Sequence, residues 1–135
     1  MQIQITTDYA IRIIMYLAQQ HEQVLTAKMM AEQLGITPGY ILKVTAKLKQ
    51  AGYIDSIQGS AGGYRLVKRT ADITLYDIIE TMEGKIHINR CLEADGFCSR
   101  GAGNSQVCPV HAIYESVQNE MIAALKSKRI SEIIK

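Results

Sequence analysis

Apolar and polar positions follow helical spacing through the first third of the chain. Residues 8–20 (DYAIRIIMYLAQQ) are apolar on nearly every face, which predicts a buried helix with Thr7 or Asp8 as its N-cap. The segment LTAKMMAEQLGI predicts a shorter helix with Thr26 as its N-cap and Gly35 at its end. Two residues later a further helix is expected to begin.

This third helix is well marked by its own sequence. The segment TPGYILKVTAKLKQAG places Thr37 at the N-cap and Pro38 at the first helical position, where the fixed φ of proline suits a helix. The apolar side of the helix is formed by Ile41, Val44, Leu48 and Ala51. The polar side is formed by Lys43, Lys47 and Gln50. Two short helices joined by a tight turn, the second with a basic outer face, are typical of a helix-turn-helix.

A glycine-tipped hairpin follows the third helix. YIDSI (residues 53–57) alternates apolar and polar positions like a half-buried strand, QGSAGG supplies a turn, and YRLVKR predicts the returning strand. Helix, turn, helix and hairpin together predict a winged helix-turn-helix; a hairpin that only packs on the body is the alternative. The next helix, ITLYDIIETMEG, is expected to have Thr74 as its cap with Asp77 three residues on, and to end at Gly84.

The last third of the chain predicts one long helix. Apolar residues recur at steps of four and three, at Val110, Tyr114, Val117, Met121 and Ala124. Three others widen this stripe: Ile113, Ile122 and Leu125. Such a seam indicates a partner helix and so a homodimer, while the closing ISEIIK is expected to return to the core. The fold class is therefore mainly α with a small β-hairpin wing: a winged helix-turn-helix domain (1–84), a cysteine-rich loop (85–108), and a dimerisation helix with a C-terminal tail (109–135).

Charge is concentrated in the predicted DNA-reading region. The chain of 135 residues has a net charge of only +2, but residues 37–69 carry six bases against the single acid Asp55. A basic segment on an acidic body is expected where one surface meets phosphates; a merely solvated helix face is the alternative. The longest apolar stretch, IIMYLA, is too short to cross a membrane, and the first residues do not resemble a signal peptide, so a cytoplasmic protein without a membrane partner is expected.

All three cysteines fall in one segment, with the spacing Cys91-x6-Cys98-x9-Cys108-x2-His111. An odd number of cysteines in a cytoplasmic chain argues against a disulfide framework. Thiolate sulfur suits zinc or an iron–sulfur cluster, and the residues alone favour these two equally, with three unligated cysteines as a further alternative. No other constellation indicates catalysis, so neither an enzyme nor a small-molecule substrate is expected.

Several of these segments resemble one family. The chain resembles the Rrf-two (Rrf2) family of bacterial winged-helix regulators, which includes IscR, NsrR and RirA. The resemblance is carried by four segments in the family's order, followed by three clustered cysteines: TTDYAIRIIMYLA, ITPGYILKVTAKLKQAGYI, GSAGGYRL and ITLYDIIETMEG. The resemblance covers essentially the whole chain. It implies dimers that bind double-stranded DNA with the recognition helix in the major groove and the wing in the minor groove. Many members hold an iron–sulfur cluster before the dimer helix, and its state sets DNA affinity; others bind none.

The resemblance also implies site residues. At the recognition helix it points to Thr37, Tyr40 and Lys43, to which the basic face adds Lys47. In the wing it points to a set around the glycine turn, namely Gly59, Gly62, Gly63 and Tyr64. Relatives often have arginine where this chain has Gln58, so a minor-groove contact is expected to be weaker here or to pass to Arg65.

The implied cluster is held by the three cysteines and a fourth ligand. NsrR-like members complete a 4Fe–4S cluster with an aspartate of the other subunit at the start of the first helix, where this chain has Asp8. IscR-like members use a histidine after the last cysteine on a 2Fe–2S cluster, which corresponds to His111. The surrounding TDYAIR favours Asp8, although a plain helix cap and a surface histidine are the respective alternatives. The expected function is a regulator that senses redox state, nitric oxide or iron; a winged-helix regulator with structural zinc or no metal is the alternative.

Overall fold

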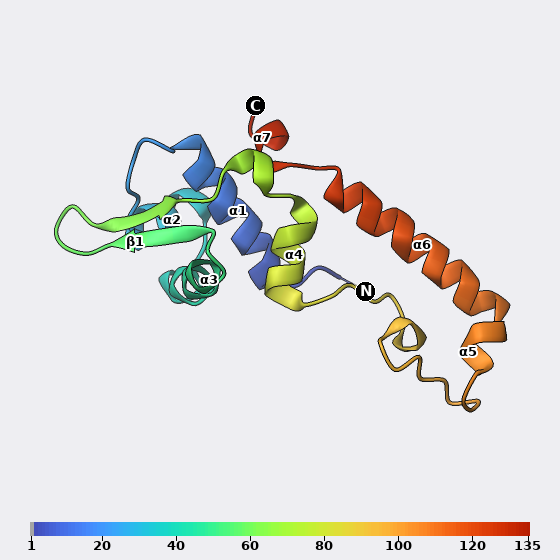
Figure 1. The fold of residues 1–135 in the computed structure, drawn as a ribbon. Helices are drawn as coiled ribbons and strands as arrows, with labels where there is room; N and C mark the ends of the chain where they lie inside the picture. Colours follow the sequence, from blue (N-terminus) through green and yellow to red (C-terminus); the bar gives the residue numbers. More distant parts are fainter. Residues whose placement is uncertain (1) are drawn as a thin grey trace.

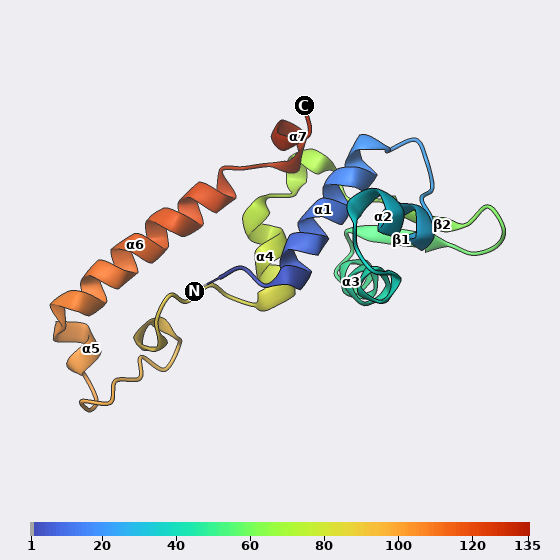
Figure 2. The ribbon, with the colours of Figure 1, turned by 180° about the vertical axis from the view of Figure 1, so that it is seen from behind.

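The computed structural model describes residues 2–135, in which a helical body carries a projecting arm (Figures 1 and 2). We call residues 85–126 the arm. In chain order the elements of the body and the arm are α1 (Ile5–Gln19), α2 (Ala27–Leu34), α3 (Pro38–Gln50), β1 (Ile54–Ile57), β2 (Gly63–Leu66), the 3-10 turn η1 (Thr70–Asp72), α4 (Leu75–Glu83), the 3-10 turn η2 (Arg90–Leu92), α5 (Asn104–Val107), α6 (Pro109–Lys126) and α7 (Ile130–Ile133).

Helix α1 packs between α3 and α4 at the centre of the body. Its buried face includes Ile13, Ile14 and Leu17, none more than 1% exposed. They meet a core whose other fully buried members include Met30, Ile41, Val44, Leu48 and Ile78. Each such side chain contributes about 1.5–3 kcal/mol by leaving water.

The predicted cap of α1 is wrong. The helix begins at Ile5 with Gln4 at the N-cap, and Thr7 is fully buried within the first two turns. The backbone N–H of Gln4 donates to the Glu83 carboxylate of α4 at 3.2 Å, a contact between distant parts of the chain that no local pattern reveals. Asp8 therefore lies in the first turn of the helix rather than at its N-cap.

The helix-turn-helix is confirmed in α2 and α3. Thr26 caps α2 by accepting a hydrogen bond from the Met29 N–H at 3.1 Å, and Gly35 ends it in the left-handed region, at φ 64°. Thr37 occupies the N-cap of α3 with Pro38 after it, but the Thr37 side chain makes no capping hydrogen bond. Ala51, predicted in the apolar stripe, is exposed because the helix has ended at Gln50.

The wing is the antiparallel pair β1–β2, in which Ile54 faces Leu66 and Ile57 faces Gly63. A bridge between Leu25 and Tyr64 adds the loop before α2 to this sheet, through two backbone hydrogen bonds of 2.7 and 2.9 Å. A Cβ at Gly63 would come within 2.6 Å of the Leu25 carbonyl oxygen, so glycine is required for this close approach.

Helix α4 and the C-terminal tail are joined. Thr74 and Asp77 form the predicted capping box at the start of α4, with hydrogen bonds of 3.1 and 2.8 Å. The Leu75 N–H donates to the carbonyl of Lys128, and the fully buried Ile130 donates its N–H to the carbonyl of Ile73, both at 2.9 Å. The tail therefore returns to the core, as the sequence predicted.

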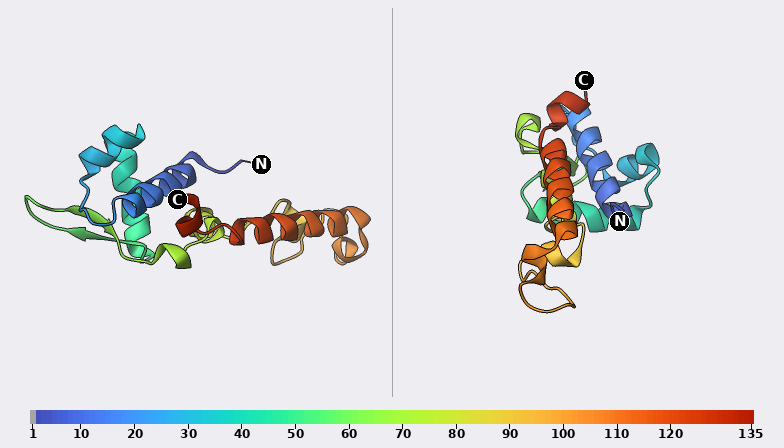
Figure 3. Two further views of the ribbon diagram at one scale, coloured as in Figure 1. Left: turned by 90° about the horizontal axis from the view of Figure 1, so that it is seen from above. Right: turned by 90° about the vertical axis from the view of Figure 1, so that its right-hand side faces the viewer.

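The arm leaves the body after α4 and returns along α6 (Figure 3). The C-terminal half of α6 packs on α4, while its N-terminal half extends away from the body. That outer half carries an exposed apolar stripe, formed by Val110, Ile113, Tyr114 and Val117. Within residues 2–135, no helix combines the length and apolarity needed to cross a bilayer.

We predict that Thr74→Ala lowers the free energy of unfolding by about 1 kcal/mol, because one N–H of α4 loses its capping partner. Urea unfolding followed by circular dichroism measures the change. Thr37→Ala is the matched control, since Thr37 occupies an N-cap without a side-chain hydrogen bond and its loss should change little. Equal losses in the two variants would contradict the assignment of the capping box as the stabilising contact.

Candidate functional site

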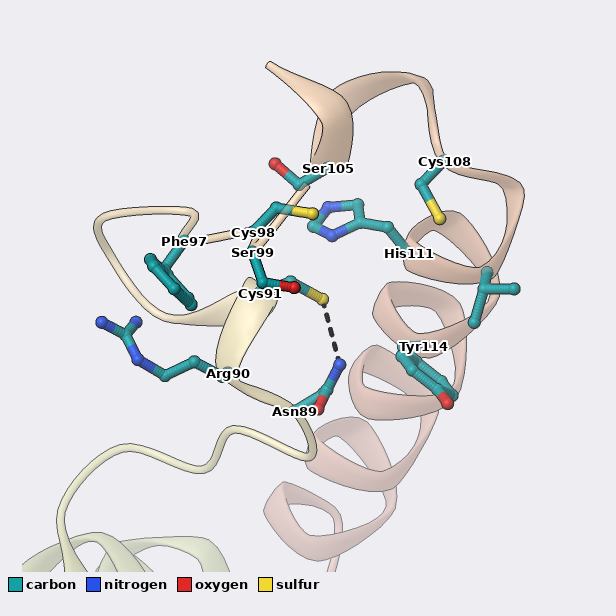
Figure 4. A pocket seen from close by; sticks show the side chains of 11 residues that line it. Asn89, Arg90, Cys91, Phe97, Cys98, Ser99, Ser105, Cys108, His111 and Tyr114 are labelled. Carbon is teal, nitrogen blue, oxygen red and sulfur yellow. Dashed lines mark hydrogen bonds between the residues drawn. The ribbon is translucent and has the colours of Figure 1, made fainter. Parts of the chain in front are cut away.

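The three cysteines and His111 line one cavity of about 240 Å³ in the arm (Figure 4). Cys91 lies in η2 and Cys98 in the loop beyond it, whereas Cys108 is the N-cap of α6 and His111 lies in its first turn. The spacing Cys108-x2-His111 brings both side chains to the same side of the helix start. The structure thus brings together the four candidate ligands of the arm.

His111 lacks a partner in this cavity. Its Nδ1 atom is buried and makes no hydrogen bond, which is costly for a polar ring nitrogen unless something else binds it. The three thiols are free and partly buried, and the Asn89 amide donates to the Cys91 sulfur at 3.3 Å. An imidazole nitrogen with soft sulfur donors fits zinc or an iron–sulfur cluster.

The donors line the cavity without meeting at a point. Among residues 2–135, no three His, Cys, Asp or Glu side chains lie close enough together to hold a single ion. A tetrahedral zinc site with Zn–S bonds near 2.3 Å needs sulfurs only about 3.8 Å apart. In a 4Fe–4S cluster each protein ligand binds a different iron atom, so the ligand sulfurs are spaced more widely.

Arg90 organises the loop between Cys91 and Cys98. Its guanidinium forms two hydrogen bonds with the Asp95 carboxylate, at 2.6 and 2.7 Å, and lies 2.9 Å from Glu93. It also lies over the Phe97 ring, 5.0 Å from the centroid. The hydrogen bonds from Arg90, with a further one from the Phe97 N–H, lower the pKa of Asp95 to about 2.

Two more contacts attach the loop to the helices around it. The buried Gln118 of α6 accepts a hydrogen bond from the Ile88 N–H at 2.9 Å. Ser105 of α5 donates to the Gly96 carbonyl at 3.2 Å. These contacts are polar and few, so the loop is held by directed hydrogen bonds rather than by a core of its own.

Asp8 lies outside this cavity in the same chain. Its carboxylate is 2.7 Å from Arg12, one turn along α1, and both side chains are about half exposed. Arg12 in turn lies over the ring of Tyr9, and that ring meets Tyr40 of α3 edge-on, with centroids 5.4 Å apart. Asp8 is therefore connected through three side chains to the start of the predicted recognition helix.

The predicted DNA-reading residues of α3 lie in different surroundings. Thr37 and Lys43 are exposed, and Tyr40 is 38% exposed although it touches Tyr9. The ammonium of Lys47 donates to the Met82 carbonyl at the end of α4, at 2.8 Å, so it points toward the body. Residue periodicity could not separate Lys47 from Lys43, because the distinction depends on where α4 ends.

The predicted wing residues divide in the same way. Gln58 and Gly59 are exposed at the tip, where they are free to meet DNA. Gly62 and Gly63 instead approach neighbouring backbone closely, and Tyr64 forms the bridge to Leu25, so each has a folding role of its own. Arg65 is 3.4 Å from Asp55 on the paired strand, with both side chains about half exposed.

The sequence did not reveal two contacts, one in the cysteine loop and one between α3 and the wing. The first is the Arg90–Asp95 pair, for which the only signal was an arginine followed by acids within five residues. The second is Lys49, which was counted in the basic segment but not assigned a contact; its ammonium donates to Ser56 of β1 at 2.7 Å.

The family match and the related proteins all point to transcriptional regulators. The Rrf2 family, described as an iron-dependent transcriptional regulator, matches residues 3–135. The transcriptional regulator NsrR of Bacillus subtilis is 28% identical over 131 residues, which cover 96% of this chain and 87% of NsrR. NsrR of Geobacillus kaustophilus is 32% identical over 97 residues, which cover 71% of this chain and 66% of that protein.

Solved structures share the fold over nearly the whole chain. IscR of T. potens superposes with a TM-score of 0.77 at 24% identity, covering 99% of this chain and 86% of IscR. CymR, the global cysteine regulator of B. subtilis, gives a TM-score of 0.75 at 25% identity, covering 99% of this chain and 96% of CymR. The winged-helix fold is thereby confirmed.

We predict that Arg90→Gln raises the pKa of Asp95 from about 2 toward its ordinary value, because the carboxylate loses the guanidinium that stabilises its charged form. In the parent protein the ion pair should persist as pH falls and be lost only near pH 2. Titration of side-chain carboxyl resonances by NMR measures both values. Arg69→Gln, which removes the partner of Asp72 elsewhere, should leave Asp95 unchanged; a parent Asp95 titrating near 4 would contradict the pairing.

Proposed function

This chain belongs to the Rrf2 family of iron-dependent transcriptional regulators, and from that premise we propose that it is a homodimeric DNA-binding regulator controlled by an iron–sulfur cluster in its arm. The family and the winged helix-turn-helix make it a DNA-binding transcriptional regulator and not an enzyme. Cluster control and dimerisation are the parts proposed here.

The observation that carries the cluster is the cavity lined by three free thiols and a half-buried imidazole whose buried Nδ1 atom makes no hydrogen bond. Cys91, Cys98 and Cys108 would hold the cluster. When bound, such a cluster would supply reactivity toward oxidants or nitric oxide, and its assembly would depend on the iron supply. The match to a family described as iron-dependent favours a cluster over a single zinc ion. Structural zinc is the second candidate.

Two residues can supply the fourth ligand, with different consequences. His111 already lines the cavity of its own chain. Asp8 would have to come from the partner subunit, because it is not among the residues that line the cavity of its own chain. An oxygen or nitrogen ligand leaves one iron more labile than thiolate would, which suits a sensor.

The exposed stripe on the outer half of α6 supports the homodimer. Ile113 and Val117 are 60% and 51% exposed, which is unusual for apolar residues at regular spacing on one helix face. A second apolar surface, formed by Ile3 and Ile5, borders Asp8 on the body. Packing of one subunit's isoleucines on the partner's α6 would bring Asp8 toward the partner's cysteine cavity.

Contacts on α1 offer a route from the cluster to DNA. If Asp8 binds iron, Arg12 loses its carboxylate partner and its position over Tyr9 changes. Because the Tyr9 ring packs against Tyr40, that change reaches the start of α3. Control of this kind requires that the two cluster states differ in DNA affinity.

We predict that the anaerobically purified protein contains iron and acid-labile sulfide, and that Cys108→Ser removes both. If Asp8 is the fourth ligand, Asp8→Ala alters the visible and electron paramagnetic resonance spectra and accelerates cluster loss, whereas His111→Ala does neither. The reverse pattern identifies His111. The measurements are metal and sulfide analysis with anaerobic spectroscopy.

A colourless protein that contains zinc without iron or sulfide would overturn the cluster and establish the zinc alternative. His21→Ala is the matched control for His111→Ala, because His21 is exposed in the loop after α1 and does not line the cysteine cavity. A change of spectrum in that variant would show that the effect does not report ligation.

We further predict that Val117→Glu converts the dimer to a monomer, because a charge within the exposed stripe opposes its burial. Analytical ultracentrifugation gives the mass, and circular dichroism checks that the helices remain. Asn119→Glu places the same charge on the other side of α6 and should leave the dimer intact. A parent protein that is monomeric at micromolar concentration would contradict the proposal.

A further inference from the structure

A groove of about 380 Å³ lies between α3 and the wing. Its lining includes Leu42 and Ala46 of α3, together with three polar side chains that face it from α3, β1 and the wing tip: Lys49, Ser56 and Gln58. No acidic residue is among the residues that line it. The groove therefore has a net positive charge and several hydrogen-bond donors.

Lys49 and Ser56 are the polar centre of this groove. The Lys49 ammonium donates to the Ser56 hydroxyl oxygen at 2.7 Å, and both groups remain open to solvent. An ammonium has three hydrogen atoms, so two remain for another acceptor, and the Ser56 hydroxyl keeps its own hydrogen to donate. The neighbouring Asp55 does not line the groove: its carboxylate accepts a hydrogen bond from the Ser56 backbone N–H at 2.8 Å and lies 3.4 Å from Arg65 on the paired strand.

We propose that this groove seats a backbone phosphate of DNA, with Lys49 and Ser56 as its hydrogen-bond donors. The proposal rests on the DNA-binding function given above. A recognition helix in the major groove and a wing in the minor groove lie on the two sides of one sugar–phosphate strand, because that strand separates the grooves. The strand must then pass between α3 and the wing, over Lys49.

Lys47, two residues earlier, has a different role. Successive helical residues turn by about 100°, so Lys47 and Lys49 lie on opposite flanks of α3. The Lys47 ammonium donates to the Met82 carbonyl in the last turn of α4, at 2.8 Å. A cation at this end of a helix pairs with a carbonyl that has no partner within the helix, and it also interacts favourably with the helix dipole. Lys47 stabilises the body, and Lys49 meets phosphate.

The salt dependence of DNA binding separates the two lysines. Each lysine that neutralises a phosphate contributes about 0.9 to the slope of log affinity against log salt concentration. Fluorescence anisotropy with a labelled 25-base-pair duplex, measured for the anaerobically prepared full chain over a range of potassium chloride concentrations, gives this slope. We expect Lys49→Ala to weaken binding a few-fold at low salt and to reduce the slope by about 0.9 for each subunit bound.

Three further variants complete the test. Lys49→Arg keeps the charge and should keep the slope, and Ser56→Ala should weaken binding without changing the slope, because serine is neutral. Lys47→Ala should lower the thermal midpoint and reduce the slope by less than Lys49→Ala does, because the Lys47 ammonium is shared with the Met82 carbonyl. If the parent protein binds the duplex but Lys49→Ala has the parent slope, the groove assignment is overturned. If the parent itself does not bind duplex DNA, the proposed function fails instead.

Discussion

Burial of α1 between α3 and α4 is the interaction on which the rest of the structure depends. Ile13, Ile14 and Leu17 lose almost all of their exposure there, and each contributes energy comparable to a sizeable fraction of a small domain's net stability. One side of α1 supports the recognition helix, and the other supports α4, from which the arm departs. A single buried helix thus fixes the geometry of the DNA-reading surface relative to the base of the arm.

The cysteine segment obeys a different constraint, since it lies outside that core. Arg90 and Asp95 hold the loop through charged hydrogen bonds, while Gln118 attaches it to α6. Segments with few buried apolar contacts open at lower free energy than the core. The proposed cluster would be well placed in such a segment, because opening the segment to gain or lose the cluster would not unfold the winged helix-turn-helix domain.

The parts of the fold that depend on local pattern could be predicted from the sequence. The helix-turn-helix, the wing and the capping box at Thr74 follow from periodicity, glycine placement and cap residues, and the cysteine spacing indicated one shared cavity. The cap of α1 was predicted wrongly because it depends on a distant contact: Gln4 pairs with Glu83, and the helix begins three residues before Asp8. The hydrogen bond from Lys47 to Met82 also depends on a distant contact and has no local signal. The position of Asp8 relative to a partner subunit cannot follow from one chain's periodicity.

Both attachments of the arm are on the same short helix. The chain enters the arm from Gly84 at one end of α4, and where it returns, the carbonyl of Lys128 accepts a hydrogen bond from Leu75 at the other end. Helix α4 therefore carries both junctions between the arm and the body, so the place of the cysteine cavity depends on how α4 is held. The Lys47–Met82 hydrogen bond joins α4 to the recognition helix, so one short helix contacts both the arm and the reading surface.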